Sequence, residues 1–105
     1  MSNSINLLSW NCHSLYGKLN HFRTNLYKYT PHIVCLSETW LRNDREPVFI
    51  NYQKYLCNRN QSSGGGIGIL VRRDLISNIK ILTPFADGNL EIQAVTINSF
   101  DKKKL

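Results

Sequence analysis

The feature that most constrains the fold is the order of three segments near the start of the chain: an apolar run, an amphipathic helical pattern and a second apolar run. Residues 5–10, INLLSW, are apolar enough for a largely buried strand, and residues 33–36, IVCL, form a continuous run typical of a strand covered on both faces. Between them, apolar residues recur at alternating spacings of four and three, and Pro31 ends the pattern. This apolar stripe consists of Leu15, Leu19, Phe22, Leu26 and Tyr29. The order predicts a strand, helix, strand unit of an α/β fold.

Polar side chains follow both predicted strands. Such a unit almost always makes a right-handed crossover between parallel strands, so the two carboxyl ends emerge at one edge of the sheet. Asn11 comes just after the first strand, and Glu38 comes just after the second, in CLSETWL. Because open α/β sheets bind ligands beyond the carboxyl ends of their strands, we expect a site containing Asn11 and Glu38, with His13 at its rim.

The chemistry of these residue types indicates what such a site would hold. Glu38 is a hard oxygen ligand suited to Mg²⁺ or Mn²⁺, and the Asn11 amide can hold the ion, a water or a phosphate oxygen. The alternative for this pair is a strand-end hydrogen bond or a helix cap. No ordered Ser, His and acid arrangement supports a hydrolase triad. Trp40 could stack on a base, but an aromatic residue at this place is more typical of packing.

A glycine-rich segment, SSGGGIG, precedes the next predicted strand. It lacks the Gly-Lys-Ser/Thr of a phosphate-binding loop, so we interpret its glycines as a tight turn and a close backbone approach where the strand begins. Arg72 and Arg73 at the end of that strand are candidate contacts to nucleic-acid phosphate, and His13 is a further candidate for binding nucleic acid. The remaining predicted strands are an aromatic run at 51–59 and segments 78–82 and 90–97, with PFADGN, residues 84–89, as a turn.

Composition bounds the class of protein. With 105 residues and 42% hydrophobic residues the chain is one small globular domain, and a net charge of +6 favours an anionic partner such as nucleic acid or a membrane surface. Three of those charges are Lys102, Lys103 and Lys104, so a solvated surface is the alternative. The three cysteines are too far apart for a disulfide framework or a zinc site. Without a secretory signal or an apolar run of membrane length, we expect an intracellular protein, nuclear or cytoplasmic and not secreted, with no membrane partner.

The segments LLSWNCHSL, PHIVCLSETWL and GGGIGILVRRDL, with the amphipathic helix between the first two, resemble the start of the endonuclease/exonuclease/phosphatase superfamily. The likeness is greatest to the apurinic-type endonuclease domain of non-LTR retrotransposons. It implies an α/β fold in which residues 1–105 form the N-terminal part of a four-layer α/β/β/α sandwich, DNase I-like and truncated, so that the chain is a partial domain. In such a sandwich two sheets pack face to face between helical layers.

The resemblance also implies a function. Asn11 matches the family's strand-end Asn at the phosphate and metal site, and Glu38 matches its metal-binding Glu. The implied activity is Mg²⁺-dependent hydrolysis of a phosphodiester, which nicks target DNA so that a 3′ hydroxyl primes reverse transcription. DNA would be the partner, with a reverse transcriptase domain in a longer polyprotein. The repair branch tends to carry an acid where this chain has His13, which favours the retrotransposon branch.

Family members continue with a Tyr-bearing strand, a Gly-Asp-Phe-Asn-like segment and a final Ser-Asp-His segment, and the chain stops at Leu105 before any of them. We therefore expect it to be inactive or incomplete by itself, and to self-associate through an uncovered sheet face. A different class of function is a non-catalytic, basic nucleic-acid-binding remnant that uses Arg72, Arg73 and the lysine tail. A third possibility is a decayed reading frame without a functional product.

Overall fold

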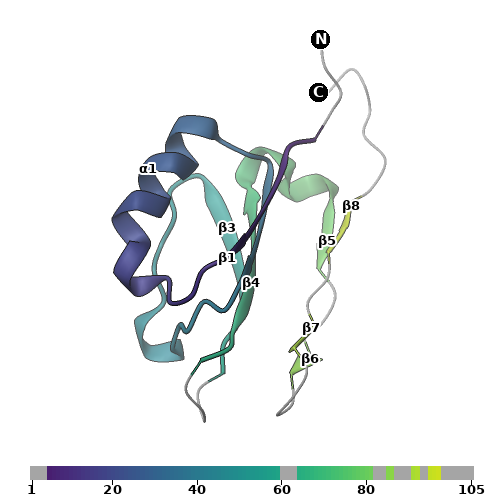
Figure 1. Ribbon diagram of the computed structural model, residues 1–105. Helices are drawn as coiled ribbons and strands as arrows, with labels where there is room; N and C mark the ends of the chain where they lie inside the picture. The colour runs from purple at the N-terminus through teal and green to yellow at the C-terminus, as the bar shows by residue number, and fades with distance from the viewer. Residues whose placement is uncertain (1–4, 60–63, 82–84, 87–90, 93–94, 98–105) are drawn as a thin grey trace.

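A computed structural model describes residues 5–59, 64–81, 85–86, 91–92 and 95–97 of the chain. Four strands form its main sheet in the order β1-β2-β4-β3, and one helix, α1, lies against it (Figure 1). These elements are β1 (Leu7–Asn11), α1 (Leu19–Tyr29), β2 (Ile33–Ser37), β3 (Tyr52–Cys57) and β4 (Ile67–Arg72). β1 pairs with β2 in parallel, whereas β4 runs antiparallel to both β2 and β3. The predicted strand, helix, strand unit with parallel strands is confirmed.

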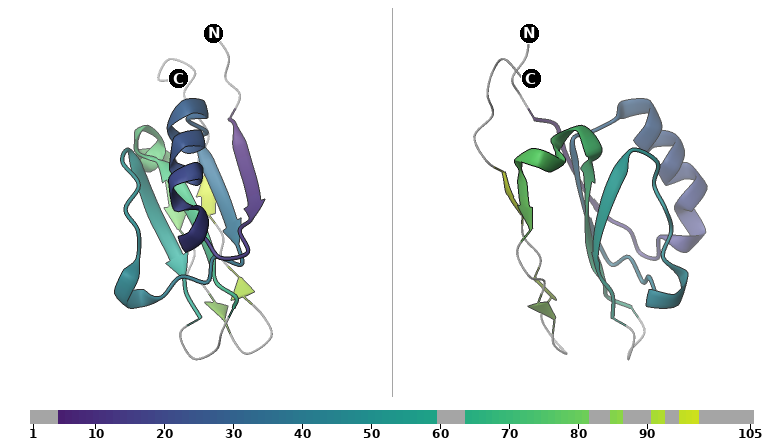
Figure 2. Two further views of the ribbon diagram at one scale, coloured as in Figure 1. Left: turned by 60° about the vertical axis from the view of Figure 1, so that its left-hand side comes forward. Right: turned by 180° about the vertical axis from the view of Figure 1, so that it is seen from behind.

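Four shorter strands follow the main sheet along the chain. β5 (Ile79–Ile81) pairs antiparallel with β8 (Val95–Ile97), and β6 (Phe85–Ala86) pairs antiparallel with β7 (Glu91–Ile92). They lie on the side of the main sheet opposite α1 (Figures 1 and 2). The predicted turn at 84–89 is wrong where Phe85 and Ala86 are concerned, because their backbone pairs with that of β7; the other residues of that turn lie outside the described part of the chain.

The helix forms where the apolar spacing predicts it. A short 3₁₀ turn at Tyr16–Lys18 leads into α1, and Thr30 ends the helix in a left-handed conformation, with its amide donating to the Leu26 carbonyl at 2.9 Å. Phe22 is the centre of its buried stripe. The Phe22 ring stacks on the ring of Trp10 in β1, with the two centroids 5.3 Å apart. It also meets the Phe49 ring edge-on, with the centroids 5.5 Å apart. These contacts fix the helix over one face of the sheet.

β2 is one of the two inner strands of the main sheet, and it is covered on both faces as predicted. Val34 and Leu36 pack in the cluster beneath α1, which also contains Phe22 and Leu70. On the other face, a smaller cluster of buried side chains contains Ile33, Ile69, Val71 and Leu75. Alternate side chains of β2 therefore enter different cores, which explains why a continuous apolar run is needed at this place.

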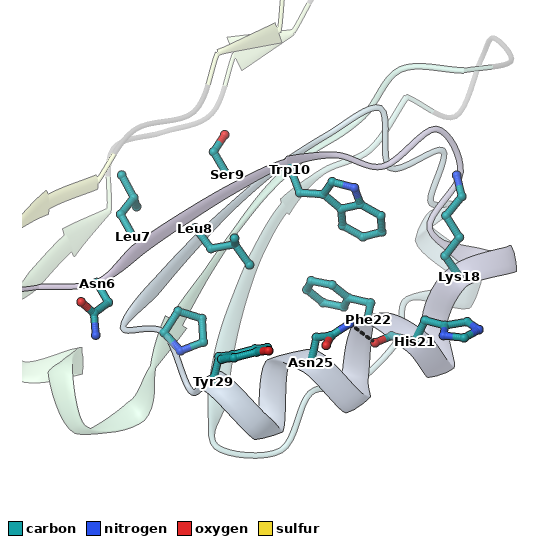
Figure 3. Close-up of a pocket in the computed structure, with 11 residues that line it drawn as sticks. Asn6, Leu7, Leu8, Ser9, Trp10, Lys18, His21, Phe22, Asn25 and Tyr29 are labelled. Atoms are coloured by element: carbon teal, nitrogen blue, oxygen red, sulfur yellow. Dashed lines mark hydrogen bonds between the residues drawn. The ribbon is translucent and has the colours of Figure 1, made fainter.

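The prediction that the first strand is largely buried is wrong. β1 is an edge strand in the described sheet, and Leu7 and Leu8 expose 64% and 41% of their surface. Tyr29, the last residue of the predicted helical stripe, is also exposed. The uncovered edge borders a groove of about 700 Å³ between β1 and α1 (Figure 3). Among the residues that the structure describes, no helix has the length and apolarity that crossing a membrane requires.

Candidate functional site at the carboxyl ends of β1 and β2

The parallel register of β1 and β2 brings the two sequence-predicted site residues to one sheet edge. Asn11 pairs with Ser37 at the end of the ladder, and Glu38 is the next residue along the chain. Asn11 is exposed at this edge and is the last residue of β1 rather than the first residue after it. The expected placement of the two strand ends is confirmed. The catalytic and metal-binding roles assigned to Asn11 and Glu38 stay predictions.

The loop that carries Glu38 is held from two sides by backbone hydrogen bonds. On the β1 side, the Ser14 amide donates to the Glu38 carbonyl at 3.1 Å, and the Leu15 amide donates to the Thr39 carbonyl at 2.9 Å. On the β4 side, the amides of Thr39 and Trp40 donate to the carbonyls of Gly66 and Gly65 at 3.1 and 2.9 Å. The segment at 38–40 is therefore fixed between two neighbouring loops.

Backbone conformations at this edge are unusual for residues other than glycine. His13, Ser14, Glu38 and Trp40 all have positive φ, at 46°, 75°, 50° and 55°. Each such residue costs free energy of order 1 kcal/mol or more and persists only where surrounding contacts impose it, so their clustering is a feature of functional sites. Here the backbone bonds described above, together with the fully buried Thr39, supply those contacts.

The carboxylate of Glu38 accepts two hydrogen bonds. Its Oε2 atom accepts one from the Trp40 indole Nε1–H at 3.0 Å and one from the Gly65 amide at 2.8 Å. These bonds, that of Trp40 first, lower the pKa of Glu38 from its ordinary value, and electrostatic interactions with His13 and Arg59 act in the same direction. Glu38 is therefore ionised at neutral pH, the state in which a carboxylate binds a cation.

His13 and Trp40 form the rim of the site. The His13 ring meets the Trp40 indole edge-on, with ring centroids 6.0 Å apart, and the role of His13 in the site stays a prediction. Trp40 exposes 41% of its surface and is bonded to Glu38, so core packing does not describe it. Sequence reasoning missed both Trp40 and Gly65 as partners of Glu38. No sequence signal identifies them, because the contact with Gly65 requires β4 to lie beside β2.

The glycine segment is a tight turn and a close approach, as predicted. Gly64, Gly65 and Gly66 all have positive φ, and they lead directly into β4. A Cβ atom at Gly66 would lie 2.5 Å from Thr39 Oγ1, a distance that no real contact of this kind adopts. The absence of a side chain at Gly66 therefore allows the backbone of this turn to pair with Thr39 beside Glu38.

Arg72 and Arg73, predicted to contact nucleic acid, are not brought to this edge. Because β4 is antiparallel to β2, it ends where β2 begins, and the Arg72 amide donates to the His32 carbonyl at 2.8 Å. The Arg72 guanidinium bonds both carboxylate oxygens of Asp74, at 2.8 and 2.9 Å, and the Thr30 carbonyl at 2.7 Å. Arg72 thus ties the end of the helix to the strand. Arg73 is exposed nearby, and its role in binding stays a prediction.

The pair of Arg72 and Asp74 predicts an acid-dependent contribution to stability. The hydrogen bonds from Arg72 lower the pKa of Asp74, so the stabilisation is present above the ordinary carboxyl pKa and is lost as pH falls through the lower, folded-state pKa. Because the Asp74 side chain is 60% exposed, we expect Asp74→Asn to lower the free energy of unfolding by at most about 1 kcal/mol at pH 7. The difference should shrink toward zero below about pH 3.

Urea unfolding of the two proteins at pH 7 and pH 3 measures this effect. Asp44→Asn is the matched control, because Asp44 is an exposed aspartate in a separate 3₁₀ turn. A loss of the same size at both pH values would contradict the role of the ion pair.

The described residues fit part of a divalent-cation site. They contain no cluster of three or more His, Cys, Asp or Glu side chains that could enclose an ion. Mg²⁺, however, keeps several waters and is commonly held by one or two carboxylates together with substrate phosphates. An ionised Glu38 just after β2, with Asn11 at the end of the neighbouring parallel strand β1, suits this mode of binding.

The fold and this edge define an α/β protein with a polar site at the carboxyl ends of two parallel strands. The sequence matches the Endonuclease/Exonuclease/phosphatase family over residues 8–102, and the chain belongs to this family. No curated protein matches the sequence.

Solved structures show which fold this is. An AP endonuclease from Archaeoglobus fulgidus superposes on 65% of this chain with a TM-score of 0.58 and 21% sequence identity. An AP endonuclease from Leishmania major superposes on 73% of this chain with a TM-score of 0.62 and 16% sequence identity. A 3′ phosphatase from Neisseria, bound to a product DNA hairpin, gives 0.69 at 20% identity over 90% of this chain. The chain covers 27%, 27% and 38% of these three proteins. The predicted class, an α/β fold of the DNase I-like type, is confirmed, and the chain spans about a third of such structures.

Proposed function

We propose that this chain is the N-terminal part of a Mg²⁺-dependent DNA endonuclease of the kind encoded by non-LTR retrotransposons. The observation that carries the proposal is the ionised Glu38 carboxylate, which two N–H groups hold just after β2, in a chain of this family whose neighbouring parallel strand β1 ends at Asn11. In this proposal residues 1–105 are one partial domain. The segments that complete the site follow Leu105 in a longer protein.

The chain's own residues would perform two tasks in phosphodiester hydrolysis. Glu38 would hold the cation through its carboxylate, and Asn11 would orient a phosphate oxygen or the cation through its uncharged amide. Bound Mg²⁺, or Mn²⁺ in its place, neutralises phosphate oxygens and stabilises the leaving oxygen. The base that activates water would come from the later His and Asp of the complete domain. For this reason we expect the isolated chain to lack full activity.

Two further features support the choice of DNA and of the retrotransposon branch. A protein of the same fold, the 3′ phosphatase from Neisseria, is bound to a DNA hairpin, and the chain itself carries a net charge of +6. His13 stands where the repair branch tends to carry an acid, and its ring packs on Trp40. We propose an intracellular protein that acts beside a reverse transcriptase domain of the same polyprotein.

We propose that the isolated chain self-associates. The sequence predicts a sheet face as the surface for this, and we propose the uncovered β1 edge as a second candidate surface. It exposes Leu7 and Leu8 next to the groove on which Trp10, Phe22 and Tyr29 also border (Figure 3). Unpaired strand edges with apolar side chains are templates for pairing with another chain. Sedimentation of the isolated chain would test this directly.

Nicking of supercoiled plasmid tests the proposed activity. The chain is compared with a version extended through the downstream reading frame, each with Mg²⁺ and with EDTA. We expect Mg²⁺-dependent nicking by the extended protein and little by the short chain. Salt-sensitive DNA binding without cleavage by either protein would instead support a non-catalytic nucleic-acid-binding remnant. Glu38-dependent nicking by the short chain would contradict the proposed incompleteness of its site.

A further inference from the structure

From the contacts around Glu38 we infer that Trp40 is a positioning residue: its indole N–H and the Gly65 amide together hold Oε2 of Glu38, so that Oε1 is presented to a divalent cation. This inference rests on the proposed function, in which Glu38 is a cation ligand. It adds the means by which a partly exposed loop carboxylate is kept in one orientation. A carboxylate at the end of a free side chain would first have to lose rotamer freedom on binding a cation.

Both hydrogen bonds end on the same oxygen. Trp40 Nε1 lies 3.0 Å and the Gly65 amide nitrogen 2.8 Å from Oε2. An ionised carboxylate has about four acceptor positions, two on each oxygen. Two donors on Oε2 therefore fix the plane of the group while leaving the second oxygen for a ligand. Partners of this kind orient a metal ligand and are as important to its affinity as the ligand's own chemistry.

The indole is placed for this contact by features that a surface tryptophan would not need. Positive φ at Glu38 and at Trp40 turns the chain back on itself, so that two side chains separated by one residue meet. Thr39, which lies between them, is completely buried and anchors the turn. A Cβ at Gly64 would lie 3.5 Å from Trp40 Nε1, which shows that the glycine turn passes directly beside the bonded nitrogen. Strained backbone and a buried anchor therefore maintain a single side-chain hydrogen bond.

The alternative role for an exposed tryptophan beside such a site is to stack on a nucleic-acid base. Stacking on a base and positioning of Glu38 respond differently when Trp40 is replaced with phenylalanine. A phenylalanine keeps an aromatic face for stacking but has no N–H to donate to Glu38. Trp40→Phe therefore separates positioning from stacking in one substitution.

The first readout is the indole N–H signal of Trp40 in a ¹H–¹⁵N NMR spectrum of the whole chain. The chain has two tryptophans, and Trp10 stacks on Phe22 away from the site, so its indole signal is an internal control. We expect Glu38→Gln to shift the Trp40 indole signal and to leave that of Trp10 in place. An unchanged Trp40 signal would overturn the inference, because the bond would then be absent in solution.

The second readout is the binding of Mn²⁺ alone, followed by paramagnetic broadening of the backbone amide signals of Ser37 and Thr39. We expect Trp40→Phe to raise the Mn²⁺ concentration that gives half-maximal broadening by about tenfold, the lower end of the range for loss of a hydrogen bond that supports a metal ligand. Tyr29→Phe, an aromatic change at the far end of α1, should leave it unchanged. The dispersion of the other amide signals shows whether each variant is folded.

The outcomes distinguish this inference from the proposed function. If Glu38→Gln leaves Mn²⁺ binding unchanged, Glu38 is not a cation ligand and the proposed function fails. If Glu38→Gln weakens binding but Trp40→Phe does not, the proposed function stands and the positioning role of Trp40 is wrong. If Trp40→Phe leaves Mn²⁺ binding unchanged and only Trp40→Ala lowers the DNA affinity measured in EDTA, the tryptophan stacks on nucleic acid and the inference is likewise wrong.

Discussion

Replacing Glu38 with glutamine is expected to abolish Mg²⁺-dependent nicking by the extended protein, with a loss of at least about 100-fold. The substitution removes one negative charge and one oxygen ligand while keeping the size of the side chain. In the wild-type chain, two N–H donors favour the ionised carboxylate. In the variant, one terminal atom of the amide is an NH₂ donor, so it cannot replace the carboxylate oxygen that faces a cation. The rate of plasmid nicking at saturating Mg²⁺ measures the loss.

Glu46→Gln is the matched control for this experiment. Glu46 is also a partly buried loop glutamate, but it lies in a separate part of the chain, where it accepts a bond from Asn58 at 2.8 Å and lies 3.7 Å from Lys54. We expect this variant to nick at close to the wild-type rate, since a partly exposed ion pair of this kind contributes little to stability. Equal loss in both variants would point to damage to folding, and wild-type nicking by Glu38→Gln would exclude Glu38 as an essential ligand.

The parts of this site that could be predicted from the sequence are those determined by local pattern. The four-and-three spacing around Phe22 identifies the helix, and the apolar run at 33–36 identifies an inner strand. Right-handed crossover then places Asn11 and Glu38 at the same edge without further information. Each of these inferences depends on residues close together in the chain.

The parts that could not be predicted depend on which strands become neighbours. Local pattern does not show that β4 lies antiparallel beside β2, and this pairing brings Gly65 to Glu38 while taking Arg72 to the opposite end of the sheet. The exposure of Leu7 has the same origin, because an apolar strand at the edge of a sheet has the same sequence pattern as one at its centre. Likewise, nothing in SETWL indicates that the indole turns back to the carboxylate.

The second large effect is expected from Gly66→Ala, which should lower the free energy of unfolding by about 3 kcal/mol. Two costs add at this residue. Its φ of +91° is one that L side chains rarely adopt, and the new Cβ would lie 2.5 Å from Thr39 Oγ1. Thr39 cannot move away easily, because it is completely buried and its amide donates to the Gly66 carbonyl. Relief of the clash therefore requires the whole segment at 38–40 to shift.

Two other glycines provide graded controls for this substitution. A Cβ at Gly17 meets nothing within 4 Å, so Gly17→Ala should change stability by less than about 0.5 kcal/mol. A Cβ at Gly68 would lie 2.6 Å from Leu56 Cδ2, the end of a flexible side chain that can rotate away, so Gly68→Ala should fall between the two. Urea unfolding of the three variants measures the order of their free energies of unfolding.

Because the Gly66 turn also carries the Gly65 amide, Gly66→Ala should shift the Trp40 indole NMR signal even in the fraction that stays folded, whereas Gly17→Ala should leave it in place. A Gly66→Ala protein as stable as wild type, with an unchanged indole signal, would show that the turn does not hold Glu38.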